Sequence, residues 1–278
     1  MNLGGGFFEL WSPVVLLFVI VAGYAYHRWT GSPQAGQADE LRVPLSQKLS
    51  FYTGLVLFYI GQGSPINFIG HHYLFSVHML QQTMLFLIVP IFIWLGTPER
   101  LFQSLLRSKV FKALFHFFTR PFIALFLFNI LFSIYHLPLV MNALMANELM
   151  YFGYHIVLFA SAFAMWYPVF PVVRDERELS DLKKMAYTFG NGILLTPACA
   201  LIIFADSVIY DMYQNVTIPF AHLSTLDDQQ LGGVIMKIIQ EIVYAAVLAY
   251  TFFKWYRRER GKEDDYPDGY VADGPTEA

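Results

Sequence analysis

The amino-acid sequence predicts an all-α integral membrane bundle of seven transmembrane helices, with the N-terminus outside and the C-terminus cytoplasmic. Of its 278 residues, 56% are hydrophobic and only 14% are charged, whereas about a quarter of a typical soluble chain is charged. Apolar stretches close to the roughly 20 residues of a membrane-spanning helix recur along the chain. Basic residues are confined to alternate loops between these stretches. Together these features argue against an ordinary soluble domain.

Seven apolar stretches define the predicted spans. Continuous runs of this length indicate helices, because the strands of a membrane barrel would be about ten residues long and would alternate in polarity. The first stretch is expected to be a permanent span and not a signal peptide, since no Lys or Arg precedes it and Arg28 follows it. In chain order the spans are Leu10–Tyr26, Leu49–Ile69, Tyr73–Pro98, Pro121–Asn147, Tyr151–Val173, Met185–Ala205 and Gln229–Phe253.

The distribution of basic residues predicts the orientation of the bundle. Apart from Lys237, every Lys and Arg lies after span one, three, five or seven, and the N-terminus and the remaining loops contain none. Cytoplasmic loops of membrane proteins carry the excess of Lys and Arg. We therefore expect a transmembrane domain over residues 1–258, beginning outside the cytoplasm, followed by a polar, disordered cytoplasmic tail over residues 259–278.

Histidines gather at the predicted outer side. His27 and His116 fall among basic residues on the cytoplasmic side. At a rise of 1.5 Å per residue, His78 and His155 should lie about 9 and 10 Å below the outer surface. His71 and His78, seven residues apart, are expected to share a face of the third span about 10 Å apart, so a metal site would need ligands from several helices. The outer histidines are His71, His72, His78, His136, His155 and His222.

The chemistry of these side chains points to copper as one candidate ligand. Imidazole binds copper, zinc, iron and nickel, and thioether sulfur adds a preference for Cu(I). The single cysteine, Cys199, lies in the sixth span, which excludes an internal disulfide and a cysteine-based zinc motif. The alternative is structural: interhelical hydrogen bonds for the histidines and packing for the methionines, with His222 solvated in a loop. The outer methionines are Met79, Met141, Met145, Met150 and Met212.

Two further polar features lie at the same side. Lys237 and Glu241 are four residues apart, which permits an ion pair along the seventh helix. The acidic residues Asp227 and Asp228 could cap that helix, attract cations or dock a partner, and the sequence leaves these three roles open. The paired glycines Gly232-Gly233 permit close contact with a neighbouring helix.

The chain resembles the CtaG family of cytochrome c oxidase assembly proteins, the polytopic kind that Gram-positive bacteria use for caa-type oxidases. The resemblance extends over nearly the whole chain and rests on four features. They are His71-His72-Tyr73-Leu74-Phe75-Ser76-Val77-His78-Met79-Leu80-Gln81, Tyr135-His136-Leu137-Pro138, the span-five His155, and Asp228-Gln229-Gln230-Leu231-Gly232-Gly233.

The resemblance implies a non-catalytic factor in the plasma membrane that handles copper destined for the oxidase. On this hypothesis Cu(I) or Cu(II) is bound by His78, His136 and His155, assisted by His71 or His72. The expected partners are cytochrome c oxidase subunits and the lipid bilayer, with an extracytoplasmic copper donor and a second copy of the chain as further candidates. Nothing indicates binding to nucleic acid.

Three other functions compete with this hypothesis. A b-type haem electron carrier would use paired histidines on neighbouring spans as axial ligands. A transporter would need a polar route across the membrane, but the inner halves of the spans hold few ionisable groups. A metalloprotease is disfavoured because no His-Glu-x-x-His pattern occurs.

Overall fold

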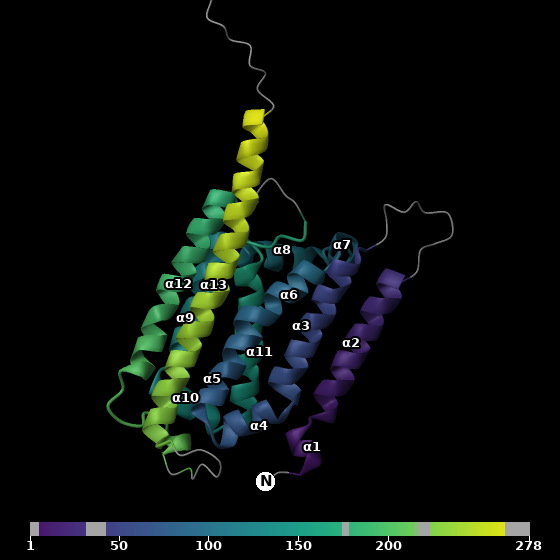
Figure 1. Ribbon diagram of the computed structural model, residues 1–278. Coiled ribbons are helices and arrows are strands. Elements are labelled where there is room, and N and C mark those ends of the chain that lie inside the picture. The colour runs from purple at the N-terminus through teal and green to yellow at the C-terminus, as the bar shows by residue number, and fades with distance from the viewer. Residues whose placement is uncertain (1–5, 32–42, 174–177, 215, 217–222, 265–278) are drawn as a thin grey trace, which may run out of the picture.

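The computed structural model describes residues 6–31, 43–173, 178–214, 216 and 223–264. All the regular structure among these residues is helical. The long helices run side by side in one bundle, and short helices lie at each of its ends (Figure 1). At one end are α1 (Phe7–Leu10), α4 (Pro65–His72) and α10 (Pro138–Met145), and at the other are α7 (Glu99–Leu105) and α8 (Lys109–Phe118).

Within the described residues, five helices are long and apolar enough to cross a membrane. A sixth span results if α8 and α9 (Pro121–Tyr135), which meet at 76°, are counted as one. The predicted second span, α3 (Leu45–Gly63), lies beside α2 (Figure 1) but is not one of the five. The chain is therefore a helical membrane protein with five or six candidate spans by length and composition. The five are α2 (Pro13–Gly31), the segment Phe75–Gly96, α11 (Glu148–Trp166), α12 (Asp181–Ile203) and Thr225–Gly261 of α13 (Thr225–Asp264).

Prolines shorten two of the predicted spans. The fourth span does not continue to Asn147, because α9 ends at Tyr135 and Pro138 starts the separate helix α10. In the same way α3 ends at Gly63, and Pro65 starts α4. Proline lacks a backbone N–H and disfavours the helical conformation of the preceding residue, so it begins a helix more readily than it continues one. Both short helices lie at the histidine end of the bundle (Figure 1).

The third span is the central helix of the bundle. It consists of α5 (Phe75–Thr83), the π-helical turn η2 (Met84–Ile88) and α6 (Val89–Gly96). In its most apolar window 61% of residues are buried, against 39% or less in the other four candidate spans. The π-helical turn immediately precedes Pro90, which cannot donate a backbone hydrogen bond. The helices packed around it therefore determine which of its side chains are exposed.

Close backbone packing joins α2, α3 and α6 at the end of the bundle where α7 and α8 lie. The Tyr26 hydroxyl donates a hydrogen bond of 2.8 Å to the carbonyl oxygen of Gly96. The rings of Tyr26 and Phe51 stack with centroids 3.8 Å apart. A Cβ atom added at Gly96 would lie 2.3 Å from the backbone nitrogen of Phe51. Only glycine fits at this position without a shift of the α3 backbone.

We expect Gly96→Ala to destabilise the protein by about 2 kcal/mol, the usual cost of overpacking a close contact. Thermal unfolding of the purified protein in detergent measures the effect. Gly153→Ala on α11 is the matched control, because an added Cβ there meets nothing within 4 Å. Alanine favours a helix over glycine by up to about 1 kcal/mol, so the control should unfold at the same or a higher temperature. Equal unfolding temperatures for the two variants would contradict the packing described here.

Ion pairs along α12 and α13 account for several of the charges in or near the spans. Lys237 Nζ lies 2.6 Å from Glu241 Oε1, as the spacing predicted, and also donates to Thr196 Oγ1 on α12 at 2.8 Å. At the opposite end, Arg258 on α13 pairs with Asp181 at the start of α12 at 3.0 Å. Helix α13 continues past residue 258 to Asp264, and residues 265–278 of the predicted tail lie outside the described residues.

Candidate functional site

Tyr135, the last residue of α9, lies at the centre of a buried histidine cluster. Its hydroxyl oxygen is 2.9 Å from His78 Nε2 on α5. Its ring centroid lies 5.0 Å from that of His136 and 5.2 Å from that of His155 on α11. The Tyr135, His78 and His136 side chains are fully buried. The three histidines predicted on separate spans therefore converge, but each of them contacts a tyrosine that the sequence analysis did not single out.

His71 joins the same cluster from α4. The predicted separation of about 10 Å from His78 is wrong, because the chain turns at Tyr73 and Leu74 and the two residues belong to different helices. Their ring centroids lie 6.3 Å apart. Helix α4 packs directly on the first turn of α5, since a Cβ at Gly70 would lie 2.9 Å from the backbone nitrogen of His78. His78 consequently lies in the first turn of its span and not in the second.

The histidines differ in their hydrogen bonding. His155 has both ring nitrogens engaged: Nδ1 with the Tyr151 carbonyl at 3.0 Å and Nε2 with the Gln82 amide nitrogen at 2.8 Å. His136 Nδ1 donates to the Phe132 carbonyl at 2.7 Å, which leaves Nε2 as the unprotonated nitrogen. That Nε2 is buried and has no hydrogen-bond partner among the described residues.

His78 also has one free ring nitrogen. Its Nδ1 is buried and has no hydrogen-bond partner among the described residues, although the Gln81 side chain interacts with the ring. The cluster thus offers two unpartnered imidazole nitrogens, His78 Nδ1 and His136 Nε2, from two different elements. Buried polar atoms normally find a partner, so two such atoms in one cluster require an explanation.

His72 lies at the rim of the cluster. Its side chain is exposed, its Nδ1 bonds to the Phe68 carbonyl at 3.0 Å, and its ring lies 5.7 Å from that of His71. His222 is outside the described residues. Among the residues that the structure describes, no three His, Cys, Asp or Glu side chains are grouped as the ligands of a metal ion. Of the five predicted ligands, four therefore lie close together around Tyr135 without forming a closed coordination site.

Burial keeps His71 and His136 neutral. The pKa of His71 falls from 6.5 to about 4, mainly because burial disfavours the charged ring and secondly because His72 is close. Burial also lowers the pKa of His136, in the turn between α9 and α10, to about 4. Both imidazoles are therefore unprotonated at neutral pH, which is the form that binds metal ions.

The sequence contained signals for the polar residues that surround the histidines. Gln82 lies four residues after His78, so the two side chains share a face of α5 and reach into the same cluster. Tyr135 immediately precedes His136. Tyr151 lies four residues before His155, and their rings are 3.9 Å apart. Helical spacing from the histidines would have found Gln82 and Tyr151, whereas Tyr135, directly adjacent to His136 in the chain, does not follow that spacing.

Asp228 resolves the open question about the acidic loop. Its side chain is 1% exposed and caps α5, not its own helix. Oδ2 accepts from the backbone N–H of Phe75 at 2.7 Å and of Ser76 at 3.4 Å, and Oδ1 accepts from the Ser76 hydroxyl. Asp227, by contrast, is exposed and bonds to Ser224 at the start of α13. One acidic residue therefore fixes the helix that carries His78. Its neighbour Asp227 accepts from the Ser224 hydroxyl, which caps α13 by accepting from the Asp227 backbone N–H.

The rest of the Asp228–Gly233 motif also has a structural role. Gln229 Oε1 accepts from the Ile209 backbone N–H at 2.9 Å, and Gln230 donates to the Ala205 carbonyl at 3.0 Å. A Cβ at Gly232 would lie 2.6 Å from the Phe75 ring, and one at Gly233 would lie 2.8 Å from Ile203. The motif thus holds α13 against both α5 and α12, which supports the prediction of close glycine contacts.

The chain was compared with known proteins, solved structures and protein families. No curated protein and no solved structure matches the chain. The family model described as cytochrome c oxidase caa3 assembly factor (Caa3_CtaG) matches residues 22–258. The match begins within α2 and ends within α13, so it covers most of the helical bundle and the whole histidine cluster. The chain therefore belongs to the cytochrome c oxidase caa3 assembly factor family.

Proposed function

We propose that this protein is a non-catalytic assembly factor of the plasma membrane that holds copper at the histidine cluster and supports its insertion into cytochrome c oxidase. In this proposal α3 also crosses the membrane, which brings the number of spans to seven. The cluster faces outside the cytoplasm, and the C-terminus is cytoplasmic. Membership in the family supports the assembly role. The basic residues of α7 and α8 support a cytoplasmic position for that end of the bundle.

The pair of unpartnered nitrogens, His78 Nδ1 and His136 Nε2, is the observation that carries the proposal. Leaving a buried polar atom without a partner costs about 1–3 kcal/mol, and a bound metal ion would offset that cost at both atoms. The His136 ring is oriented by its Nδ1 bond to a backbone carbonyl, an arrangement typical of metal-ligating histidines. Imidazole nitrogen is a suitable donor for copper.

The incomplete ligand set favours copper as cargo over copper as a resident cofactor. Structural metal sites in proteins use a closed set of ligands, typically four for zinc. Here His155 has both ring nitrogens engaged, and His71 lies beside His78 without completing such a set. A site with few protein ligands would release its ion readily to an oxidase subunit and accept it readily from an extracytoplasmic donor.

Cells that lack the gene for this chain provide the functional test. We expect them to make the oxidase polypeptides but to assemble an oxidase with less than a tenth of its copper, and a plasmid copy of the wild-type gene should restore the copper content. Copper and haem are quantified in the purified oxidase. A copper-replete oxidase in the deleted cells would refute the proposal. An absorption spectrum of the purified assembly factor with a Soret band would instead favour the b-type haem alternative.

A further inference from the structure

Helix α8 lies at the end of the bundle opposite to the histidine cluster and is placed to lie along a membrane surface. It is bent by 76° from α9, so if α9 crosses the bilayer, α8 runs close to the bilayer plane. Large hydrophobic side chains project from it with exposed fractions of 40% to 71%. They are Val110, Phe111, Leu114, Phe117 and Phe118. An amphipathic helix in this position typically inserts its apolar face at the boundary between headgroups and acyl chains.

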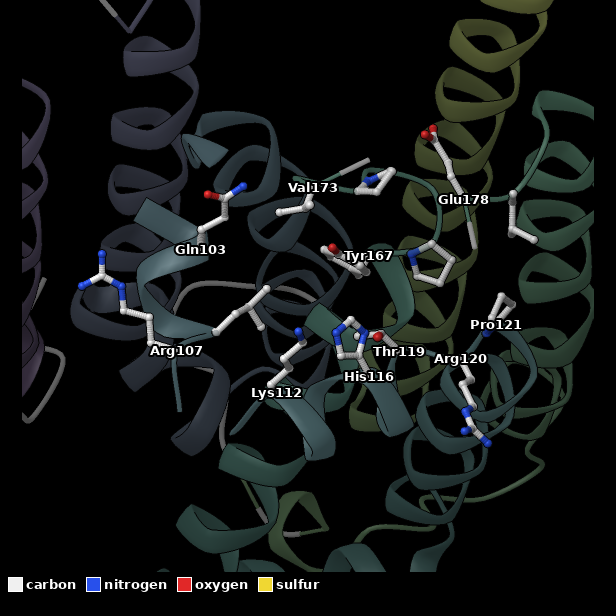
Figure 2. A pocket seen from close by; sticks show the side chains of 14 residues that line it. Gln103, Arg107, Lys112, His116, Thr119, Arg120, Pro121, Tyr167, Val173 and Glu178 are labelled. Carbon is white, nitrogen blue, oxygen red and sulfur yellow. The ribbon is translucent and has the colours of Figure 1, made fainter. Parts of the chain in front are cut away.

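A cavity of about 510 Å³ adjoins the other face of α8. It is bounded by α7, α8, the start of α9 and the chain segment that follows α11. Lys112 and His116, four residues apart on one face of α8, line its middle, and Arg107 and Arg120 lie toward opposite edges (Figure 2). Tyr167, together with proline and aliphatic side chains, gives the cavity an apolar part as well.

The described residues that line this cavity carry a net positive charge. Three of its lining residues, Arg107, Lys112 and Arg120, carry fixed positive charges. Among the described residues that line the cavity, Glu178 is the one carboxylate, set against three cations, and it lies 2.6 Å from the buried ammonium group of Lys184. The cavity therefore attracts an anion at the depth of the membrane surface.

We propose that this cavity binds the phosphate headgroup of an anionic membrane lipid, with the lipid's acyl chains running along the apolar face of α8. Basic pockets between membrane helices recognise such headgroups through charge and hydrogen bonds. The cavity combines cationic donors with an apolar wall, which fits a phospholipid better than a fully hydrated free anion. The bound lipid would fix α8 against the membrane surface. This site is separate from the histidine cluster, and the proposal does not depend on copper.

The test measures binding of dioleoylphosphatidylglycerol to the purified full-length chain in a neutral detergent by native mass spectrometry. Dioleoylphosphatidylcholine and inorganic phosphate are the comparison ligands. At 0.15 M salt we expect the wild type to bind the anionic lipid about tenfold more tightly than the zwitterionic one. The double variant Arg107→Gln, Lys112→Gln should lose that preference. The matched control, Arg100→Gln with Lys109→Gln, removes the same charges from exposed positions nearby that do not line the cavity and should keep it within twofold.

Each outcome decides the proposal. If the wild type binds the two lipids equally, the proposal is overturned without reference to any variant. If both double variants lose the lipid preference equally, the proposal is also overturned, because the preference then comes from general surface charge. Displacement of the lipid by millimolar inorganic phosphate assigns the cavity to a free anion and overturns the lipid proposal. If the Arg107→Gln, Lys112→Gln variant unfolds, Arg107→Lys with Lys112→Arg retains the charge and should retain the lipid preference.

Discussion

Replacing both His78 and His136 by alanine is expected to lower the Cu(I) bound by the purified protein at least tenfold. Each substitution removes one of the two buried imidazole nitrogens that lack a hydrogen-bond partner. A tenfold loss corresponds to about 1.4 kcal/mol, the lower end of what the loss of an outer-shell partner costs in metal sites. The measurement is equilibrium competition for Cu(I) with a chromophoric chelator, carried out in detergent under reducing conditions.

The matched control for this variant removes two other imidazoles. His27→Ala with His116→Ala changes the histidines at the opposite end of the bundle and should bind copper as the wild type does. The single variant His155→Ala tests which histidines of the cluster bind copper. In the wild type both ring nitrogens of His155 are already hydrogen-bonded. We expect this variant to reduce copper binding less than either His78→Ala or His136→Ala. Equal copper binding by the wild type and the His78, His136 double variant would exclude these atoms as ligands.

Asp228→Ala is expected to destabilise the protein by about 3 kcal/mol. The substitution leaves two backbone N–H groups and the Ser76 hydroxyl without their acceptor at a buried helix start, and each buried unsatisfied group costs about 1–3 kcal/mol. Thermal unfolding in detergent measures the change. Because α5 carries His78 in its first turn, the same variant should also weaken copper binding.

Two variants at the acidic pair distinguish this role from a general effect of charge. Asp228→Asn keeps an acceptor oxygen in place and should cost about 1 kcal/mol. Asp227→Ala removes the adjacent carboxylate, which is exposed and bonds only to Ser224, and should cost less than about 1 kcal/mol. If Asp227→Ala destabilises the protein as much as Asp228→Ala does, the cap on α5 is not the source of the effect.

Hydropathy was sufficient to locate most of the bundle in the sequence. The predicted spans around residues 73–98, 151–173 and 185–205 correspond to helices in the structure, because a long apolar run is itself the requirement for crossing a bilayer. The predicted second span had a weaker hydropathy signal, since α3 contains several polar residues and is not one of the five helices that are long and apolar enough to cross a membrane. Its place beside α2 depends on tertiary packing that composition does not encode.

The ends of the spans were harder to predict for a local reason. The apolar run continues past Pro138 to residue 147, so hydropathy alone predicted one span where the structure has two helices separated after His136. A similar turn at Tyr73 and Leu74 separates His71 from His78. The break at Tyr73 and Leu74 brings His71 and His78 closer together than a straight helix allows. Proline and turn positions deserve more weight than continuous hydropathy near the end of a span.

Contacts between distant segments account for what the sequence left open at the site. Asp228 caps a helix that begins 153 residues earlier in the chain, and no local pattern indicates that pairing. Tyr135 reaches His78 on another span, 57 residues away. The sequence predicted which side chains gather at one end of the bundle. It did not predict that a tyrosine would occupy the centre of the group.

X-ray absorption at the copper edge, recorded on the purified wild-type chain loaded with one equivalent of Cu(I), tests most directly whether the imidazoles around Tyr135 hold the metal. We predict a first shell of nitrogen neighbours with the outer-shell scattering of imidazole rings, and its disappearance in the His78→Ala, His136→Ala variant. A first shell dominated by sulfur, or an unchanged nitrogen shell in that variant, would place the copper elsewhere and contradict the account.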